Sequence, residues 1–245
     1  MPYASLGGLQ LFYEEFGHGE AVLFLHSHFS RGLLAFGAQI QPFQGQYRCL
    51  FPDLRGHGRT ICTDLTWDSR RAADDLPAFL DSLGVDRAHL IGYSFGCSVG
   101  LYFAAKYPQR VRSLCCIGAS SEPVSDGSED FLPERLIATG DRDTIETMNA
   151  RHYDAHQGNW QEYLRQTVRD WQTHPNLTEE EWRSLSCPVF FINGEHDPFG
   201  NVRALQAKCP HAQVFEVPDG SHRPHFPMEQ AKEINEKILA FLSAH

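Results

Sequence analysis

Short apolar runs alternate with longer amphipathic stretches along most of the chain. The run at 21–25 (AVLFL) is apolar at every position, which is typical of a strand buried on both faces of a parallel sheet. An alternating run at 9–13 indicates a half-buried strand, and we expect it at the edge of the sheet. The remaining runs that predict strands are 47–51, 88–91, 112–117, 189–192 and 213–217.

Three stretches between these runs have apolar residues at helical spacing. They cover residues 68–83, 94–107 and 229–241. Gly84 and Pro108 follow the first two, and these residue types commonly end helices. Strands that alternate with helices predict an α/β fold, with a mostly parallel sheet covered by helices on both faces.

One long segment interrupts this alternation. Residues 120–186 are polar, rich in charge and helical in pattern, and we find no strand signal within them. The sequence therefore predicts a core domain formed by residues 1–119 and 187–245, with a helical insertion at 120–186 that lies over the sheet.

Composition narrows the function classes. The chain has 245 residues, 42% of them hydrophobic, and a formal net charge of −10, which argues against binding to nucleic acid or to an anionic membrane. No secretory signal or run of about 20 apolar residues is found. The seven cysteines contain no Cys-x-x-Cys pair, so we expect buried, unreactive thiols, no metal site and a cytoplasmic location.

A G-x-S-x-G segment, Gly92-Tyr93-Ser94-Phe95-Gly96, lies between a predicted strand and a predicted helix. This is the context of a nucleophile elbow, in which a sharp turn exposes the serine above the sheet. The flanking glycines relieve crowding in the turn, and the nearby helix N-terminus favours developing negative charge. The pattern predicts that Ser94 is a nucleophile, whereas the simpler interpretation is a serine at a helix N-cap.

A nucleophilic serine needs a general base and an acid that orients it. Two later strand-to-turn segments supply them at the same edge of the sheet, namely Asp197 before Pro198 and His222 after Gly220. We therefore expect a Ser94, His222 and Asp197 triad. Glu195 and His225 are the alternative acid and base.

These segments together resemble the α/β-hydrolase superfamily over nearly the whole chain. The segment 51–59 (FPDLRGHGR) is similar to the family's D-x-R-G-x-G loop, and 220–224 (GSHRP) is similar to its catalytic histidine segment. The resemblance implies that residues 120–186 cap the active site. It also implies that the backbone N–H groups of His28 and Phe95 form the oxyanion hole. Here the chain departs from the family pattern, with Ser27 where glycine is usual. For His26, packing within the loop is the favoured role.

The predicted chemistry is acyl transfer to water through an acyl-serine intermediate, with no cofactor and no metal. Relatives that use aspartate at the elbow, such as haloalkane dehalogenases, are excluded by Ser94. We expect a small-molecule partner, a small and fairly apolar ester, thioester or lactone. The candidate pocket walls in the insertion are Tyr153, Trp160 and Trp171.

Three alternatives remain open on the same residues. The first is C–C bond hydrolysis or a lyase step with the same triad, and the second is a haloperoxidase side activity. The third is a ligand receptor with slow turnover on a hydrolase scaffold. The sequence predicts no particular oligomeric state.

Overall fold

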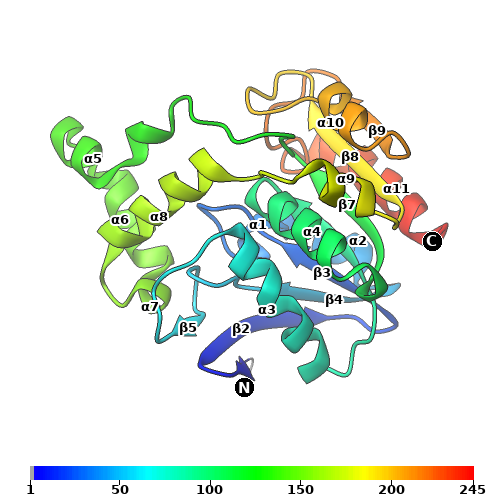
Figure 1. Ribbon diagram of the computed structural model, residues 1–245, viewed down its shortest axis with the longest axis horizontal. Coiled ribbons are helices and arrows are strands. Elements are labelled where there is room, and N and C mark those ends of the chain that lie inside the picture. Colours follow the sequence, from blue (N-terminus) through cyan, green and yellow to red (C-terminus); the bar gives the residue numbers. More distant parts are fainter. Residues whose placement is uncertain (1–2) are drawn as a thin grey trace.

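The computed structural model describes residues 3–245 and places a single nine-stranded sheet at the centre of this part of the chain (Figure 1). The strand order is β1-β2-β4-β3-β6-β7-β8-β9, and the short β5 pairs with β2. The strands are β1 (Tyr3–Leu6), β2 (Leu9–Phe16), β3 (Glu20–Leu25), β4 (Tyr47–Pro52), β5 (Ile61–Cys62), β6 (Ala88–Tyr93), β7 (Val111–Ile117), β8 (Val189–Gly194) and β9 (Gln213–Val217). Each predicted run is a strand, and most extend a residue or more further.

The sheet is parallel from β4 to β9, and β1 and β2 pair antiparallel at one end. The predicted fold class is therefore confirmed. The expectation that residues 9–13 form the edge strand is wrong, because β1 lies outside β2. Gly7 and Gly8 connect the two strands with positive φ angles of 54° and 100°. A Gly-Gly pair between two strands is typical of a hairpin turn, and here the turn connects β2 to β1, the strand at the edge of the sheet.

Helices cover both faces of the sheet, and the sheet divides the core into two clusters. One cluster contains strand side chains packed against α1 (Gly32–Ala35), α2 (Gly37–Phe43) and α11 (Met228–Ser243). The other contains side chains from α3 (Ser69–Ser82), α4 (Phe95–Lys106) and α10 (Val202–Lys208). The short helix η1 (Pro108–Arg110) leads from α4 into β7. Both layers are apolar, which explains the continuous hydrophobic runs of the central strands.

The segment between β7 and β8 is helical in the structure. It contains η2 (Ser128–Phe131), α5 (Pro133–Thr139), α6 (Arg142–Arg151), α7 (Tyr153–His156), α8 (Trp160–Thr173) and α9 (Glu179–Ser184). As the sequence pattern predicts, residues 120–186 contain no strand. Figure 1 shows α5, α6 and α7 to one side of the sheet, with α8 leading back toward it. Helix α9 packs against α4 and so contributes to the core layer.

The loop after β4 is built around one buried carboxylate. Asp53 accepts hydrogen bonds from the backbone N–H of Gly32 (2.9 Å) and from the backbone and side chain of Arg59 (3.0 and 2.9 Å). A Cβ at Gly58 would lie 2.2 Å from the Asp53 carboxylate, so only glycine fits there. The 51–59 motif thus joins the loop after β4 to the start of α1, directly after the β3 loop that holds His28.

All seven cysteines are buried and free, as the sequence predicts. Burial raises the pKa of Cys49 to about 12 and that of Cys187 and Cys209 to about 11, so these thiols stay protonated at neutral pH. None of the helices between residues 3 and 245 is long and apolar enough to cross a membrane.

Candidate active site

Ser94 lies on a strained turn between β6 and α4. Its φ of 53° and ψ of −114° place it in a region that side chains rarely adopt. A Cβ at Gly92 would lie 2.5 Å from the carbonyl oxygen of Gly96, and one at Gly96 would lie 1.9 Å from that of Leu25. Both glycines of the motif are therefore required by close backbone contacts, and the turn holds the serine at the start of α4.

Three side chains from three strand ends form a chain of hydrogen bonds. The Nε2 atom of His222 lies 3.0 Å from the Oγ atom of Ser94. Its Nδ1 atom lies 3.0 Å from both carboxylate oxygens of Asp197. An ionised carboxylate only accepts, so Nδ1 carries the proton and Nε2 is free to accept the serine hydroxyl proton.

The acid of this chain is fully buried and held on its other side. The Asp197 side chain has no exposed surface and accepts hydrogen bonds from Asn193 Nδ2 and from the backbone N–H of Phe199, each at 3.0 Å. The Phe199 ring packs edge-on against His222, with centroids 4.8 Å apart. These contacts fix the imidazole between Asp197 and Ser94.

The two amides expected to form an oxyanion hole have no acceptor. Phe95 begins α4, and His28 lies in the loop after β3; within residues 3–245, the backbone N–H of neither donates a hydrogen bond to a protein group. Ser27 has a negative φ, since the non-glycine residues with positive φ in the described chain are Ser94, Gln157 and Asp219. The serine therefore causes no left-handed strain, and it lines the larger cavity beside Ser94.

Helix α8 of the insertion contacts the His28 side chain and its backbone carbonyl. The Nε2 atom of His28 lies 2.9 Å from Oδ2 of Asp170 on α8, and Asp170 also accepts from the backbone N–H and the hydroxyl of Ser69 (2.6 and 2.8 Å). Tyr163 on the same helix donates its hydroxyl to the His28 carbonyl at 2.5 Å. The His28 ring packs on Phe95, with centroids 4.5 Å apart. Helix α8 thus contacts the loop that presents the His28 amide.

The His26 side chain contacts the same loop and the loop after β4 through its ring nitrogens. Its Nε2 atom accepts from the backbone N–H of Leu54 at 2.8 Å, so its proton is on Nδ1, which donates to the Ser27 carbonyl at 2.9 Å. Burial is the main cause that lowers the pKa of His26 to about 4. His26 is a neutral packing group, in agreement with the role favoured from the sequence.

Two cavities open onto Ser94. The smaller, about 40 Å³, is lined in part by Ser98, Ser120 and His174. The larger, about 200 Å³, is mainly aromatic. Its ring-bearing walls include Phe29, Phe131, Trp171 and Phe199. The site therefore has room for a small group in one cavity and for a larger apolar group in the other.

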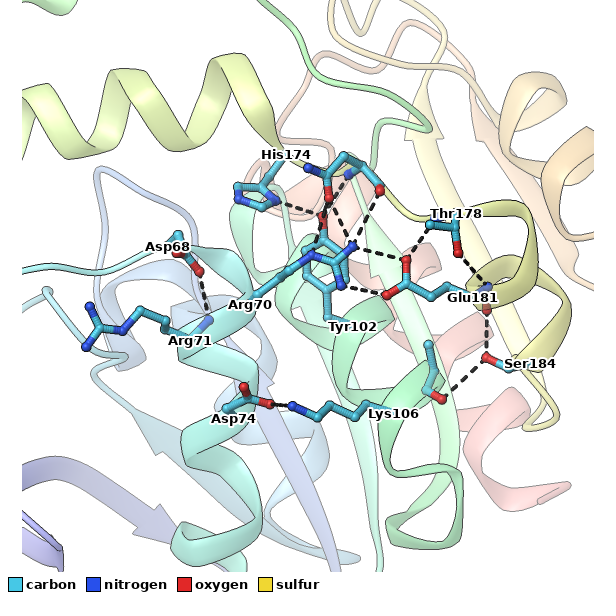
Figure 2. A network of polar contacts seen from close by, with 12 residues as sticks. Asp68, Arg70, Arg71, Asp74, Tyr102, Lys106, His174, Thr178, Glu181 and Ser184 are labelled. Carbon is cyan, nitrogen blue, oxygen red and sulfur yellow. Dashed lines mark hydrogen bonds and ion pairs between the residues drawn. The ribbon is translucent and has the colours of Figure 1, made fainter.

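A polar network holds the wall of the smaller cavity (Figure 2). Tyr102 on α4 contacts Nδ1 of His174 at 2.8 Å, donates to Oδ1 of Asn176 at 2.8 Å and accepts from the Asn176 backbone N–H at 2.7 Å. The Arg70 guanidinium lies over the Tyr102 ring and makes two hydrogen bonds to Glu181 (2.6 and 3.0 Å). The chain after α8 is thereby fixed to α3, α4 and α9.

The other predicted residues lie in different places. Trp171 lines both cavities, whereas Tyr153 and Trp160 line neither of those two; Tyr153 is 57% exposed. Glu195 is exposed and accepts from the backbone N–H of Asp219 at 3.1 Å. His225 is buried behind Tyr93 with its Nε2 atom 3.1 Å from the Ala35 carbonyl oxygen, so it does not contact Ser94.

One group within the described residues has metal-ligand spacing. Ligand atoms of Glu195, His196 and Asp219 lie within 4.8 Å of one another, but all three side chains are exposed. Exposed acidic groups commonly lie this close without an ion, so we assign them no role.

The chain is similar to known hydrolases in both sequence and structure. The model of the alpha/beta hydrolase family matches residues 22–237. The serine hydrolase BPHL of Mus musculus is 24% identical over 97% of this chain and 84% of that protein. The 2-hydroxy-6-oxo-6-phenylhexa-2,4-dienoate hydrolase of Burkholderia cepacia is 26% identical over 98% of this chain and 93% of its own. A thermophilic esterase of Thermogutta terrifontis superimposes with a TM-score of 0.74 at 25% identity, over 99% of this chain and 97% of the esterase.

Proposed function

We propose that Ser94, His222 and Asp197 are the catalytic triad of this chain, which belongs to the alpha/beta hydrolase family and is a serine hydrolase of that fold. The observation that carries the proposal is the unbroken hydrogen-bond chain from Ser94 Oγ through His222 to the buried Asp197. This arrangement has the geometry required to activate a serine hydroxyl.

The proposed reaction is acyl transfer in two halves. His222 Nε2 takes the hydroxyl proton as Ser94 Oγ bonds to the carbonyl carbon of the substrate, and the same proton then passes to the leaving alkoxide or thiolate. In the second half, His222 deprotonates a water molecule that attacks the acyl-serine, and Ser94 regains its hydroxyl. The amides of His28 and Phe95 donate to the oxyanion in both halves.

The cavities support a small, fairly apolar ester, thioester or lactone as substrate. About 200 Å³ of mainly aromatic space in one cavity and about 40 Å³ in the other limit the size of the two parts of the substrate. We also propose that residues 120–186 cap the core formed by 1–119 and 187–245, since Trp171, Phe131 and His174 from this segment line the cavities.

The test is turnover of p-nitrophenyl acetate and butyrate by wild-type and Ser94→Ala protein. We expect the variant to lose turnover and fluorophosphonate labelling while its melting temperature stays close to that of the wild type. Ser82→Ala is the matched control, because the Ser82 hydroxyl donates to the Phe79 carbonyl of its own helix. Substantial turnover in pure Ser94→Ala protein would reject Ser94 as nucleophile.

A second candidate is C–C bond hydrolysis on the same triad, favoured by the relative from Burkholderia cepacia, whose name describes a dienoate hydrolase. A panel of esters, lactones and vinylogous diketones separates the two reactions. Turnover of a diketone by protein that leaves every ester and lactone intact would assign C–C cleavage, and ester turnover alone would assign acyl transfer.

A further inference from the structure

One arginine lines the larger cavity beside Ser94, and two further arginines lie in or contact the loop that forms part of its wall. Arg223 directly follows His222 and lines the cavity together with Ser94. Arg151, at the end of α6, donates to the backbone carbonyl of Phe29, which is another lining residue. Arg31 lies two residues beyond Phe29 in the same loop. The three arginines therefore come from the insertion, from the loop after β3 and from the loop that holds His222.

Arg31 and Arg223 lie near enough to Arg151 for their charges to act on it. Burial first, and then the charges of Arg31 and Arg223, lower the pKa of Arg151. Among the side chains that the structure describes, no carboxylate lies within 4.0 Å of any of the three guanidiniums. By contrast, Arg55 and Arg59 each bind a carboxylate at 2.9 Å or less.

Like charges that lie near one another repel, and an anion bound beside them removes that repulsion. The planar guanidinium fork matches a carboxylate, to which it can donate two parallel hydrogen bonds. The aromatic walls of the same cavity suit the apolar part of such a molecule.

We infer that the larger cavity binds a substrate with an apolar body that ends in a carboxylate, held by Arg223 and Arg151 with support from Arg31. This inference rests on the proposed function, because it names the substrate class of the Ser94 site. The carboxylate is carried by the part of the ester or lactone that occupies the larger cavity, whether that part is the acyl group or the leaving group.

Two matched substrate pairs test the inference. The pair p-nitrophenyl hemiadipate and its methyl diester places the charge on the acyl group, and the pair 4-acetoxybenzoate and its methyl ester places it on the leaving group. We expect kcat/KM of the wild type to favour the charged member of one pair by about tenfold or more, the effect of one charge-assisted hydrogen bond. The pair that shows the preference identifies the half of the substrate that lies between the arginines.

Substitution then locates the effect. Arg223→Gln and Arg151→Gln should each lower the charged-to-neutral ratio about tenfold, and Arg223→Lys should keep part of the preference. Arg203→Gln is the matched control, because Arg203 is exposed on α10 and is in neither cavity lining. Equal kcat/KM within both pairs, or a preference that survives both glutamine variants, would overturn the inference.

Binding without turnover separates this inference from the proposed function. Calorimetry of both pairs with Ser94→Ala protein compares charged and neutral ligands when no reaction occurs. Tighter binding of a charged member that is lost in Ser94→Ala/Arg223→Gln supports the anion site even if wild-type protein hydrolyses no ester. Equal binding of charged and neutral members overturns the anion site while leaving the triad to its own test.

Discussion

Asp170 is expected to link the insertion to the proposed oxyanion hole, and Asp170→Asn tests this link. The side chain is 2% exposed and accepts three hydrogen bonds, one from His28 and two from Ser69. Burial by itself would raise the pKa of Asp170, but the hydrogen bond and charge of His28, with His174 and the Ser69 amide, outweigh it and lower the pKa. The group is therefore a carboxylate at neutral pH.

The magnitude follows from the number of acceptors that asparagine lacks. If its amide oxygen keeps the bond to the Ser69 backbone, its NH₂ group faces the His28 Nε2–H and the Ser69 hydroxyl. The hydroxyl can rotate to accept, but the imidazole loses a bond to a charged group, worth about 1.5–3 kcal/mol. For a chain of this size that corresponds to a fall of roughly 3–12 °C in Tm.

The expected kinetic effect is on kcat. A shifted His28 ring misdirects the backbone N–H beside it, and an oxyanion donor acts in the transition state, so we expect kcat to fall by about tenfold to a hundredfold with little change in KM. The assay is steady-state hydrolysis of p-nitrophenyl acetate, with Tm measured by circular dichroism on the same samples.

Gln166→Met provides the matched control. Gln166 is a buried residue of the same helix that bonds to the backbone of Trp67 and Leu65 rather than to His28. We expect a similar loss of Tm with kcat unchanged. If Asp170→Asn and Gln166→Met lower Tm equally and neither changes kcat, Asp170 is a structural residue only and the reasoning is refuted.

Two further predictions concern protonation. Asp197→Asn preserves volume but removes the carboxylate that fixes the His222 tautomer, so kcat should fall by about 10⁴-fold; a steady-state kcat within tenfold of wild type would contradict the assigned role. Burial is the main cause that lowers the pKa of His26 to about 4 and of His225 to about 3. Below about pH 6.5 the unfolded chain therefore binds more protons than the folded chain, so each histidine should lower the free energy of unfolding by about 2 kcal/mol between pH 7 and pH 5. Equal free energies of urea unfolding at the two pH values would exclude this.

The central strands and the three long helices are predictable because local sequence encodes them. Val22 to Leu25 must be apolar in a strand covered on both faces, and Gly92 and Gly96 are required by backbone contacts within the turn itself. The edge strand β1 is missed because four residues carry too little periodicity, although the Gly7-Gly8 pair signals the hairpin. Helix α10 is missed for the same reason, with seven residues.

The contacts around the triad are less predictable because they join residues far apart in the chain. His28 and Asp170 are separated by 142 residues, and no local pattern relates them. The aromatic walls show the same limit, since Phe29 and Phe199 lie in loops without periodicity, whereas Tyr153 on a helix is exposed. Trp171 is the one of the three candidate wall residues that lines the cavities.

Two residues of the insertion, one buried and one partly exposed, are expected to act on the Ser94 site in different ways. Asp170 is buried and bonded to the oxyanion loop, so its replacement should slow every substrate by the same factor, because all of them form the same oxyanion. Arg151 is partly exposed and has no carboxylate partner among the described residues, so its effect should depend on the charge of the substrate. A double-mutant comparison therefore has a definite expectation: the two substitutions should multiply on a charged ester, and the neutral ester should respond mainly to Asp170. Strong coupling on the neutral ester would mean instead that both residues act through one movement of the insertion.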